Sequence, residues 1–196
     1  MAIAQQDLDR AAALYEEAVP LFRNQGQTSR LAASLGNLGT IAQMRGDRTT
    51  AVGYYAEAID ASRLAGDQDG TAVNLHNLAR TELSLGRLEK GLESLRESLA
   101  IGRRLGYQEV IAYCISGFAE AAMLEEDTTR AAVLLGASEG LFAELGAIPS
   151  PDEAEAQQRV TAYVLEGLGP ERAAELRSEG AALTLDELLD RVASRT

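Results

Sequence analysis

Hydrophobic positions recur along this 196-residue chain with the spacing of an amphipathic helix. Leu31, Leu35 and Leu38 follow one another at intervals of three or four residues, which places them on one side of a helix. Runs of good helix formers of this kind alternate with short polar stretches that contain glycine, such as residues 66–70. The pattern predicts an all-α protein whose helices each bury one face.

Glycines mark the ends of these helical runs at a fixed interval. Gly26, Gly66, Gly106 and Gly146 stand 40 residues apart, and glycine adopts the left-handed conformation after a helix without steric cost. The same register aligns further columns of small or large side chains: Ala11, Ala51, Gly91 and Ala131; Tyr15, Tyr55, Leu95 and Leu135; Ala18, Ala58, Ser98 and Ser138. Small residues in fixed columns let helices approach closely, so we predict a repeat protein.

Each unit of 40 residues is predicted to hold two antiparallel helices. The first helices are expected over 28–45, 70–85 and 109–125, and the second helices over 8–25, 48–65, 88–105 and 128–145. Asp7, Asp47 and Asp127 precede second helices, and Asp is a favoured N-cap. Pro20 lies inside the earliest helix, where it can produce a kink. A helix pair cannot bury both faces alone, so the pairs are expected to stack into a solenoid.

Residues 35–59, LGNLGTIAQMRGDRTTAVGYYAEAI, resemble a tetratricopeptide repeat (TPR). The residues that match the family pattern of Leu-Gly, turn Gly, Ala, aromatic and Ala are Leu38-Gly39, Gly46, Ala51, Tyr55 and Ala58. The second unit matches with Leu78-Ala79, Gly86, Gly91, Leu95 and Ser98. The third match is weaker, with Phe118-Ala119, Glu126, Ala131, Leu135 and Ser138. The chain lacks the family's first-helix aromatic and late Pro, and its period is 40 rather than 34. The resemblance implies a right-handed α-solenoid of antiparallel helix pairs that binds protein or peptide partners without being an enzyme.

The repeat ends at Gly146, which divides the chain into TPR-like repeats over 1–146, with an incomplete first unit, and C-terminal capping helices over 147–196. Two capping boxes, Ser150/Glu153 and Thr184/Glu187, mark the starts of capping helices. Between them a break is expected at Gly169-Pro170 and a helix end at Gly180, and the last helix is expected to reach about Ser194. We expect these helices to cover the open end of the solenoid.

The C-terminal segment also resembles the end of the helical-repeat region in large bacterial regulators, which join an ATPase module, a TPR-like sensor region and often a LuxR-type DNA-binding domain. The matching residues are Leu135-Gly136-Ala137, Leu145-Gly146 and Gly180 through Leu189. This resemblance implies a module for signal transduction and transcription regulation. Residues 7–26 form a second helix without its first, so we expect either a fragment of a longer protein or a helix supplied by another copy.

Composition narrows the possible partners. The net charge of −12 disfavours direct contact with nucleic acid, whose backbone is also negative. The single cysteine, Cys114, allows no internal disulfide and indicates a reducing compartment. No apolar run approaches the roughly 20 residues that a membrane span requires, and the N-terminus does not resemble a signal peptide. We therefore expect a cytoplasmic protein.

The sequence carries no set of catalytic residues. It contains no GxxxxGK[ST], GxSxG or HExxH motif, and the lone His76 has no second histidine with which to hold a metal. We predict no catalytic residue, cofactor or metal. His76 lies away from the Leu75/Leu78 stripe and is expected to be solvated, whereas Cys114 sits among apolar residues and is expected to be structural.

In the TPR family the first helices line a concave face that holds an extended peptide or a partner helix. The positions carried over from the family are Asn37, Thr40 and Met44; His76, Asn77, Arg80 and Ser84; and Tyr113, Gly117, Glu120 and Leu124. Asn37 and Asn77 are 40 residues apart and occupy the same place in successive units. An Asn amide both donates and accepts, so these two can bond a peptide backbone. The alternative is that the amides bond to other groups of the chain itself or to water.

Two alternatives remain open at this point. The groove or the terminal cap could hold a small molecule, as sensor regions of related regulators do. The chain could instead be a self-association scaffold, in which residues 7–26 stack on another copy through Tyr15 or Phe22 to form a homodimer.

Overall fold

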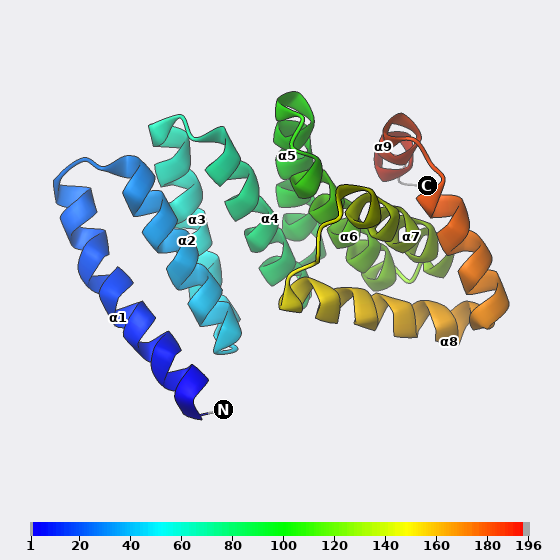
Figure 1. Cartoon of the computed structure of the whole chain (residues 1–196), viewed down its shortest axis with the longest axis horizontal. Coiled ribbons are helices and arrows are strands. Elements are labelled where there is room, and N and C mark those ends of the chain that lie inside the picture. Colours follow the sequence, from blue (N-terminus) through cyan, green and yellow to red (C-terminus); the bar gives the residue numbers. More distant parts are fainter. Residues whose placement is uncertain (1, 194–196) are drawn as a thin grey trace. The chain divides into compact units, whose positions relative to one another are not determined.

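The computed structural model describes residues 2–193, with side chains over 7–192. The described residues form α-helices joined by short turns (Figure 1). Their bounds are α1 Ala2–Asn24, α2 Thr28–Met44, α3 Arg48–Ala65, α4 Gln68–Ser84, α5 Leu88–Leu105, α6 Gln108–Leu124, α7 Thr128–Leu145, α8 Pro151–Ala181 and α9 Leu185–Ala193. The all-α, TPR-like solenoid class is confirmed, and α2 to α7 lie within two residues of their predicted bounds. The predicted helix end at Ser194 lies outside the described residues.

The helix ends follow the local signals in the sequence. Asp47 and Asp127 accept hydrogen bonds from backbone N–H groups three residues later, at 3.1 and 2.9 Å, which confirms them as N-caps. Gly66 and Gly146 close α3 and α7 in the left-handed conformation, with φ of 71° and 60°. The prediction for Asp7 was wrong, because α1 begins at Ala2 and runs unbroken past both Asp7 and Pro20.

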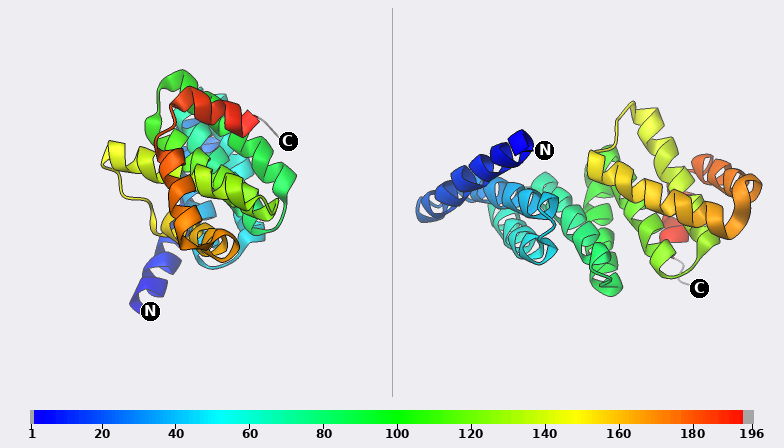
Figure 2. Two further views of the ribbon diagram at one scale, coloured as in Figure 1. Left: turned by 90° about the vertical axis from the view of Figure 1, so that its right-hand side faces the viewer. Right: turned by 90° about the horizontal axis from the view of Figure 1, so that it is seen from below.

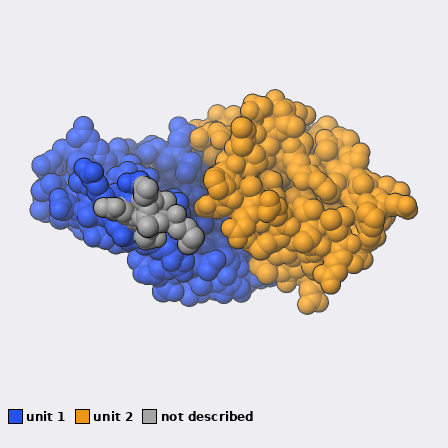
Figure 3. Space-filling view, turned by 60° about the horizontal axis from the view of Figure 1, so that its bottom comes forward, with its two compact units in different colours: residues 1–101 blue, residues 102–196 orange. Residues whose placement is uncertain are grey.

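The chain divides into two compact units, residues 1–101 and 102–196 (Figure 3). In the first unit α1, α2, α3 and α4 follow one another as packed antiparallel neighbours (Figure 1). In the second unit α6 packs on α7, and α8 packs on both (Figure 2). The division at residues 101 and 102 reflects which residues contact one another in the structure. The expected boundary between residues 146 and 147 reflects where the sequence repeat ends, and it stays a prediction.

Small residues hold the helix pairs close together. The Tyr55 side chain is 1% exposed, and its ring lies where a methyl group on Gly39 would stand. Ala51 and Ala58, which flank Tyr55 on the same side of α3, are fully buried. This is the close approach of α2 and α3 that the columns of small and large residues predicted.

The serine column ties together the two helices of a unit in the same way, in two successive units. The Ser98 hydroxyl donates to the Ala72 carbonyl at 2.7 Å, and the Ser138 hydroxyl donates to the Ala112 carbonyl at 3.3 Å. Both donors are buried and each acceptor lies 26 residues upstream. The 40-residue register therefore repeats a specific contact as well as a pattern of size.

The helix α8 is bent at Gly169, whose φ of 73° and ψ of 165° are not helical, and Pro170 follows. This confirms the predicted break. The half that follows the bend crosses α7 closely, because Gly136 and Gly180 leave no side chain between the two backbones. After it, Thr184 and Glu187 form the predicted capping box, with the Thr184 N–H donating to the Glu187 carboxylate at 2.8 Å.

Candidate functional site

A hollow of about 290 Å³ opens on the inner face of α2 and α4 in the first unit. We call it the α2–α4 groove. It is lined by Ala32, Ala33, Gly36, Asn37, Thr40, Ser62, Asp67, Asp69, Gly70, Val73, Asn74 and Asn77. Three of the residues expected to form a binding groove, Asn37, Thr40 and Asn77, thus lie together, and polar residues stand among small apolar ones in the lining.

The two repeated asparagines present their amides in this groove. Asn37 is exposed and Asn77 is half-buried. Neither side-chain amide forms a hydrogen bond with any residue that the structure describes, whereas the backbone carbonyl of Asn77 accepts from the Thr81 hydroxyl at 2.8 Å. Each amide can therefore donate to one group and accept from another.

One lining residue, Thr40, belongs to a polar network that is already satisfied and whose other members lie outside the lining. The Thr40 hydroxyl lies 3.1 Å from the Tyr55 hydroxyl, and the side-chain oxygen of Gln43 accepts from both Tyr55, at 3.3 Å, and Thr81, at 3.1 Å. This network links α2, α3 and α4. Hydrogen bonds within such a network fix one another's geometry, so Thr40 supports the shape of the groove more than it offers a free contact.

Sequence reasoning missed four polar residues of the groove: Ser62, Asp67, Asp69 and Asn74. Asp67 caps α4 and accepts from the Gly70 N–H at 2.8 Å. Asn74 is 7% exposed and donates to the Gly70 carbonyl at 2.8 Å, and its amide oxygen lies where a methyl group on Gly36 would stand. Ser62 is fully buried in the groove wall, and its hydroxyl has no hydrogen-bond partner among the described residues. Asp69 is exposed in the first turn of α4. The sequence signal for Asn74 was Gly36, whose missing side chain leaves the room that the Asn74 amide fills.

The structure corrects the expectation that His76 is solvated. Its side chain is 6% exposed and does not line the groove. Burial, and secondly the positive charge of Arg80, lowers the pKa of His76 to about 3, so the imidazole is neutral at pH 7. The error arose because an inner helix of a solenoid is packed on more than one side. Burial on α4 therefore extends well beyond the Leu75/Leu78 stripe.

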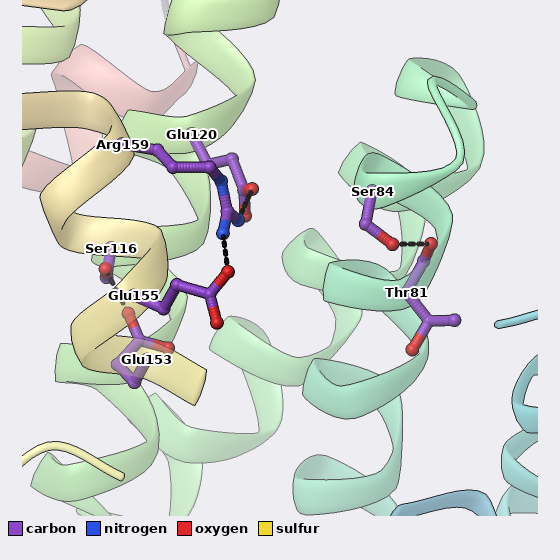
Figure 4. Close-up of polar contacts among 7 residues, drawn as sticks. All are labelled: Thr81, Ser84, Ser116, Glu120, Glu153, Glu155 and Arg159. Atoms are coloured by element: carbon purple, nitrogen blue, oxygen red, sulfur yellow. Dashed lines mark hydrogen bonds and ion pairs between the residues drawn. The ribbon is translucent and has the colours of Figure 1, made fainter. Parts of the chain in front are cut away.

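Met44, Ser84 and Arg80 also fall outside the groove lining. Met44 ends α2 and is 57% exposed. Ser84 ends α4, is exposed, and donates its hydroxyl to the Thr81 carbonyl at 2.8 Å (Figure 4). Arg80 is half-buried one turn after His76. Their roles as partner contacts stay predictions.

Two of the four expected groove residues of the third repeat are engaged by the chain itself. The Tyr113 hydroxyl accepts from the Ser150 N–H at 3.3 Å. Glu120 is 5% exposed and accepts from the Arg159 guanidinium at 2.6 Å (Figure 4). Of the two remaining positions, Gly117 is buried and Leu124 is exposed. In this unit α8 and the segment before it therefore occupy the position where a partner was expected.

One of the two predicted capping boxes is half right. The Ser150 hydroxyl accepts from the Glu153 N–H at 3.4 Å, as an N-cap does. The Glu153 carboxylate does not return to the Ser150 N–H. It is 1% exposed and accepts a short hydrogen bond from the Ser116 hydroxyl of α6 (Figure 4). Glu153 thus anchors α8 to its neighbour.

Within the described residues, no group of three or more His, Cys, Asp or Glu side chains is arranged to hold a metal ion. Over the same part of the chain, each helix is too short or too polar to cross a membrane. Cys114 is buried, as expected of a structural thiol.

Comparison with known proteins supports the fold. A solved structure, BtubC (BKLC) from P. vanneervenii, superposes with a TM-score of 0.67 at 21% sequence identity, covering 96% of this chain and 73% of that one. At this identity the likeness shows the fold alone. A search of curated proteins found no match. The family described as Tetratricopeptide repeat matches residues 1–63 and 30–104. These two matches together span more than half of the sequence, so the chain belongs to the tetratricopeptide repeat family.

Proposed function

We propose that the chain is a non-enzymatic interaction module that holds a segment of a partner protein in the α2–α4 groove. Tetratricopeptide repeats generally mediate protein–protein interactions. The observation that carries the proposal is the pair Asn37 and Asn77. These residues lie 40 positions apart in the sequence and line one hollow, and their amides are not used by the described residues.

The chemistry favours an extended backbone as the ligand. A peptide in an extended conformation presents alternating N–H and C=O groups, and an amide side chain can bond one of each. The hydroxyl of Thr40, which also lines the groove, is already bonded within the network of Tyr55 and Gln43 and does not compete for these amides. The buried Ser62 hydroxyl in the wall gains a partner if a polar group of the ligand reaches it.

The test compares two baits in extracts of the source cell. One bait is the wild-type chain and the other is the double variant Asn37→Ala/Asn77→Ala. The matched control is Asn24→Ala, which removes an exposed asparagine outside the groove. A captured protein would then be titrated against each variant by fluorescence anisotropy. Loss of two hydrogen bonds of about 1 kcal/mol each weakens binding about 30-fold. Equal binding to the wild type and the double variant would contradict groove binding.

A small ligand is the second candidate, favoured by the size of the groove, which is close to the roughly 300 Å³ lower bound of ligand pockets. A metabolite that binds only the folded state raises the melting temperature, so a thermal-shift panel on the wild type and the double variant separates the two candidates. We also propose that the module serves a bacterial regulator in the cytoplasm. The residues that resemble such regulators, 135–137, 145–146 and 180–189, support this assignment.

A further inference from the structure

The helix α1 carries an apolar stripe that lies outside the groove. Leu14 and Leu21 are 60% and 57% exposed, and Ala11 and Ala18 fall on the same side of the helix. The positions 11, 14, 18 and 21 have the alternating spacing of three and four residues that pairs two helices in a coiled coil.

The repeat register identifies this face as one that takes a helix. Ala51 and Ala58 of α3 stand 40 residues after Ala11 and Ala18, and both are fully buried, with Ala51 clustered against Ala42 of α2. In α1 the equivalent alanines are half-buried. Small residues at these positions permit the same close approach of a helix to α1.

Tyr15 and Phe22, which the sequence suggested for this contact, pack against the core between α1 and α2 instead. The half-buried Ala11 also touches this core, so it lies at the edge of the stripe. The exposed side chains are Leu14 and Leu21, the neighbours of the two aromatic residues. The contact surface is therefore rotated on α1 away from the predicted one.

The charges beside the stripe are self-complementary. Arg10 and Glu17 are exposed, stand seven residues apart, and make no ion pair with the residues that the structure describes. Asp9 and Arg23, which point toward neighbouring helices, are paired with Arg45 and Glu57. Opposite charges seven residues apart on one flank face each other when two copies of a helix run antiparallel, because Arg10 of each copy then lies beside Glu17 of the other.

We propose that the chain forms a homodimer in which α1 packs antiparallel against α1 of a second copy. The two-fold axis passes between Arg10 and Glu17, close to Leu14. A two-fold contact must use the same patch on both copies, and the arrangement of Arg10, Leu14 and Glu17 meets that condition. Alanines at 11 and 18 let the two helices approach, and the leucines fill the seam.

Sedimentation equilibrium of the full chain over a range of concentrations tests the proposal. The wild type is expected to associate above its 20.9 kDa monomer mass. Glu17→Arg and Arg10→Glu each place like charges opposite one another, and each is expected to weaken dimerisation about tenfold or more. An equimolar mixture of the two variants is expected to recover association, because every cross-helix contact in the mixed dimer is again Arg with Glu.

Leu14→Glu is expected to abolish the dimer, whereas Leu64→Glu, a change at a 78% exposed leucine on α3, is expected to leave it intact. A wild type that stays monomeric at every concentration would overturn the proposal, as would a dimer that tolerates Glu17→Arg. Failure of the mixture to recover would overturn the antiparallel arrangement. If a reversal lowers the melting temperature, Arg10→Gln and Glu17→Gln repeat the test without repulsion, and each must then weaken the dimer.

Discussion

The inner faces of the two units occupy the same repeat register and are used differently. In the first unit the face of α2 and α4 is an open groove lined by Asn37 and Asn77. In the second unit the face of α6 is covered by α8, through Glu153 on Ser116 and Arg159 on Glu120 (Figure 4). One framework thus supports both an open groove and a groove filled by the chain's own helix.

The difference lies in the side chains at equivalent positions. Ser116 and Glu120 of α6 stand 40 residues after His76 and Arg80 of α4. Ser116 and Glu120 each find a partner of complementary chemistry on α8, whereas His76 is buried and neutral. The side chains at these positions therefore decide whether the inner face binds a helix or stays open. The closed face of the second unit shows which contacts hold a helix there.

The largest expected effect comes from unseating α8. A side chain at Gly136 would overlap the backbone of Arg177, which cannot move without shifting the helix. Gly136→Val is therefore expected to lower the free energy of unfolding by about 3 kcal/mol or more. Urea unfolding followed by circular dichroism measures the change.

The matched control is Gly53→Ala. Gly53 lies within α3, is exposed, and has open space where a methyl group would stand. This change is expected to stabilise the protein by about 0.5–1 kcal/mol, because alanine loses less backbone entropy than glycine in a helix. Equal effects of the two substitutions would show that α8 does not depend on the close crossing at Gly136.

A smaller effect is expected from opening the ion pair in the closed face. Arg159→Ala leaves the buried Glu120 carboxylate without its guanidinium, at a cost of about 2 kcal/mol. The cost stays below that of a fully buried pair, because Arg159 is 44% exposed. The measurement is urea unfolding of Arg159→Ala, Glu120→Gln and the double variant.

A double-mutant cycle decides whether the two groups act together. Glu120→Gln removes the buried charge, so Arg159→Ala is expected to cost clearly less in that background. Strict additivity of the two single changes would mean that the pair contributes nothing to holding α8.

Local signals explain how much of the fold could be predicted. The glycines that close helices, the aspartates that cap them and the small-residue columns each act within one or two turns, so residues 28–145 followed their predicted helices. The contact of Glu120 with Arg159 spans 39 residues and joins a helix of the repeat, α6, to α8, which lies outside it, so no local pattern predicts the contact. Glu153 even carries the signal of a capping box, which the hydroxyl of Ser116 overrides.

The groove was predictable in part for the same reason. Asn37 and Asn77 were found because the repeat places them in equivalent positions, and both line the hollow. Ser62 and Asn74 were missed because they enter the groove from a second helix and from a buried face, which periodicity in a single helix does not reveal. The burial of His76 depends in the same way on packing from more than one side.

The smallest expected loss of stability concerns His76, which has the register position of Ser116 but is titratable. The unfolded chain binds a proton near the ordinary pKa of 6.5, whereas the folded protein binds it only near a pKa of about 3. Stability is therefore lost as the pH falls below 6.5, with a limiting slope of about 1.4 kcal/mol per pH unit.

His76 is the single histidine, so His76→Gln should flatten the curve of unfolding free energy against pH. Between pH 7 and 5.5 the wild type is expected to lose about 1 kcal/mol more than the variant in urea unfolding. Parallel curves would mean that the imidazole is hydrated in the folded state, and that the open unit is less tightly packed at this position than the closed one.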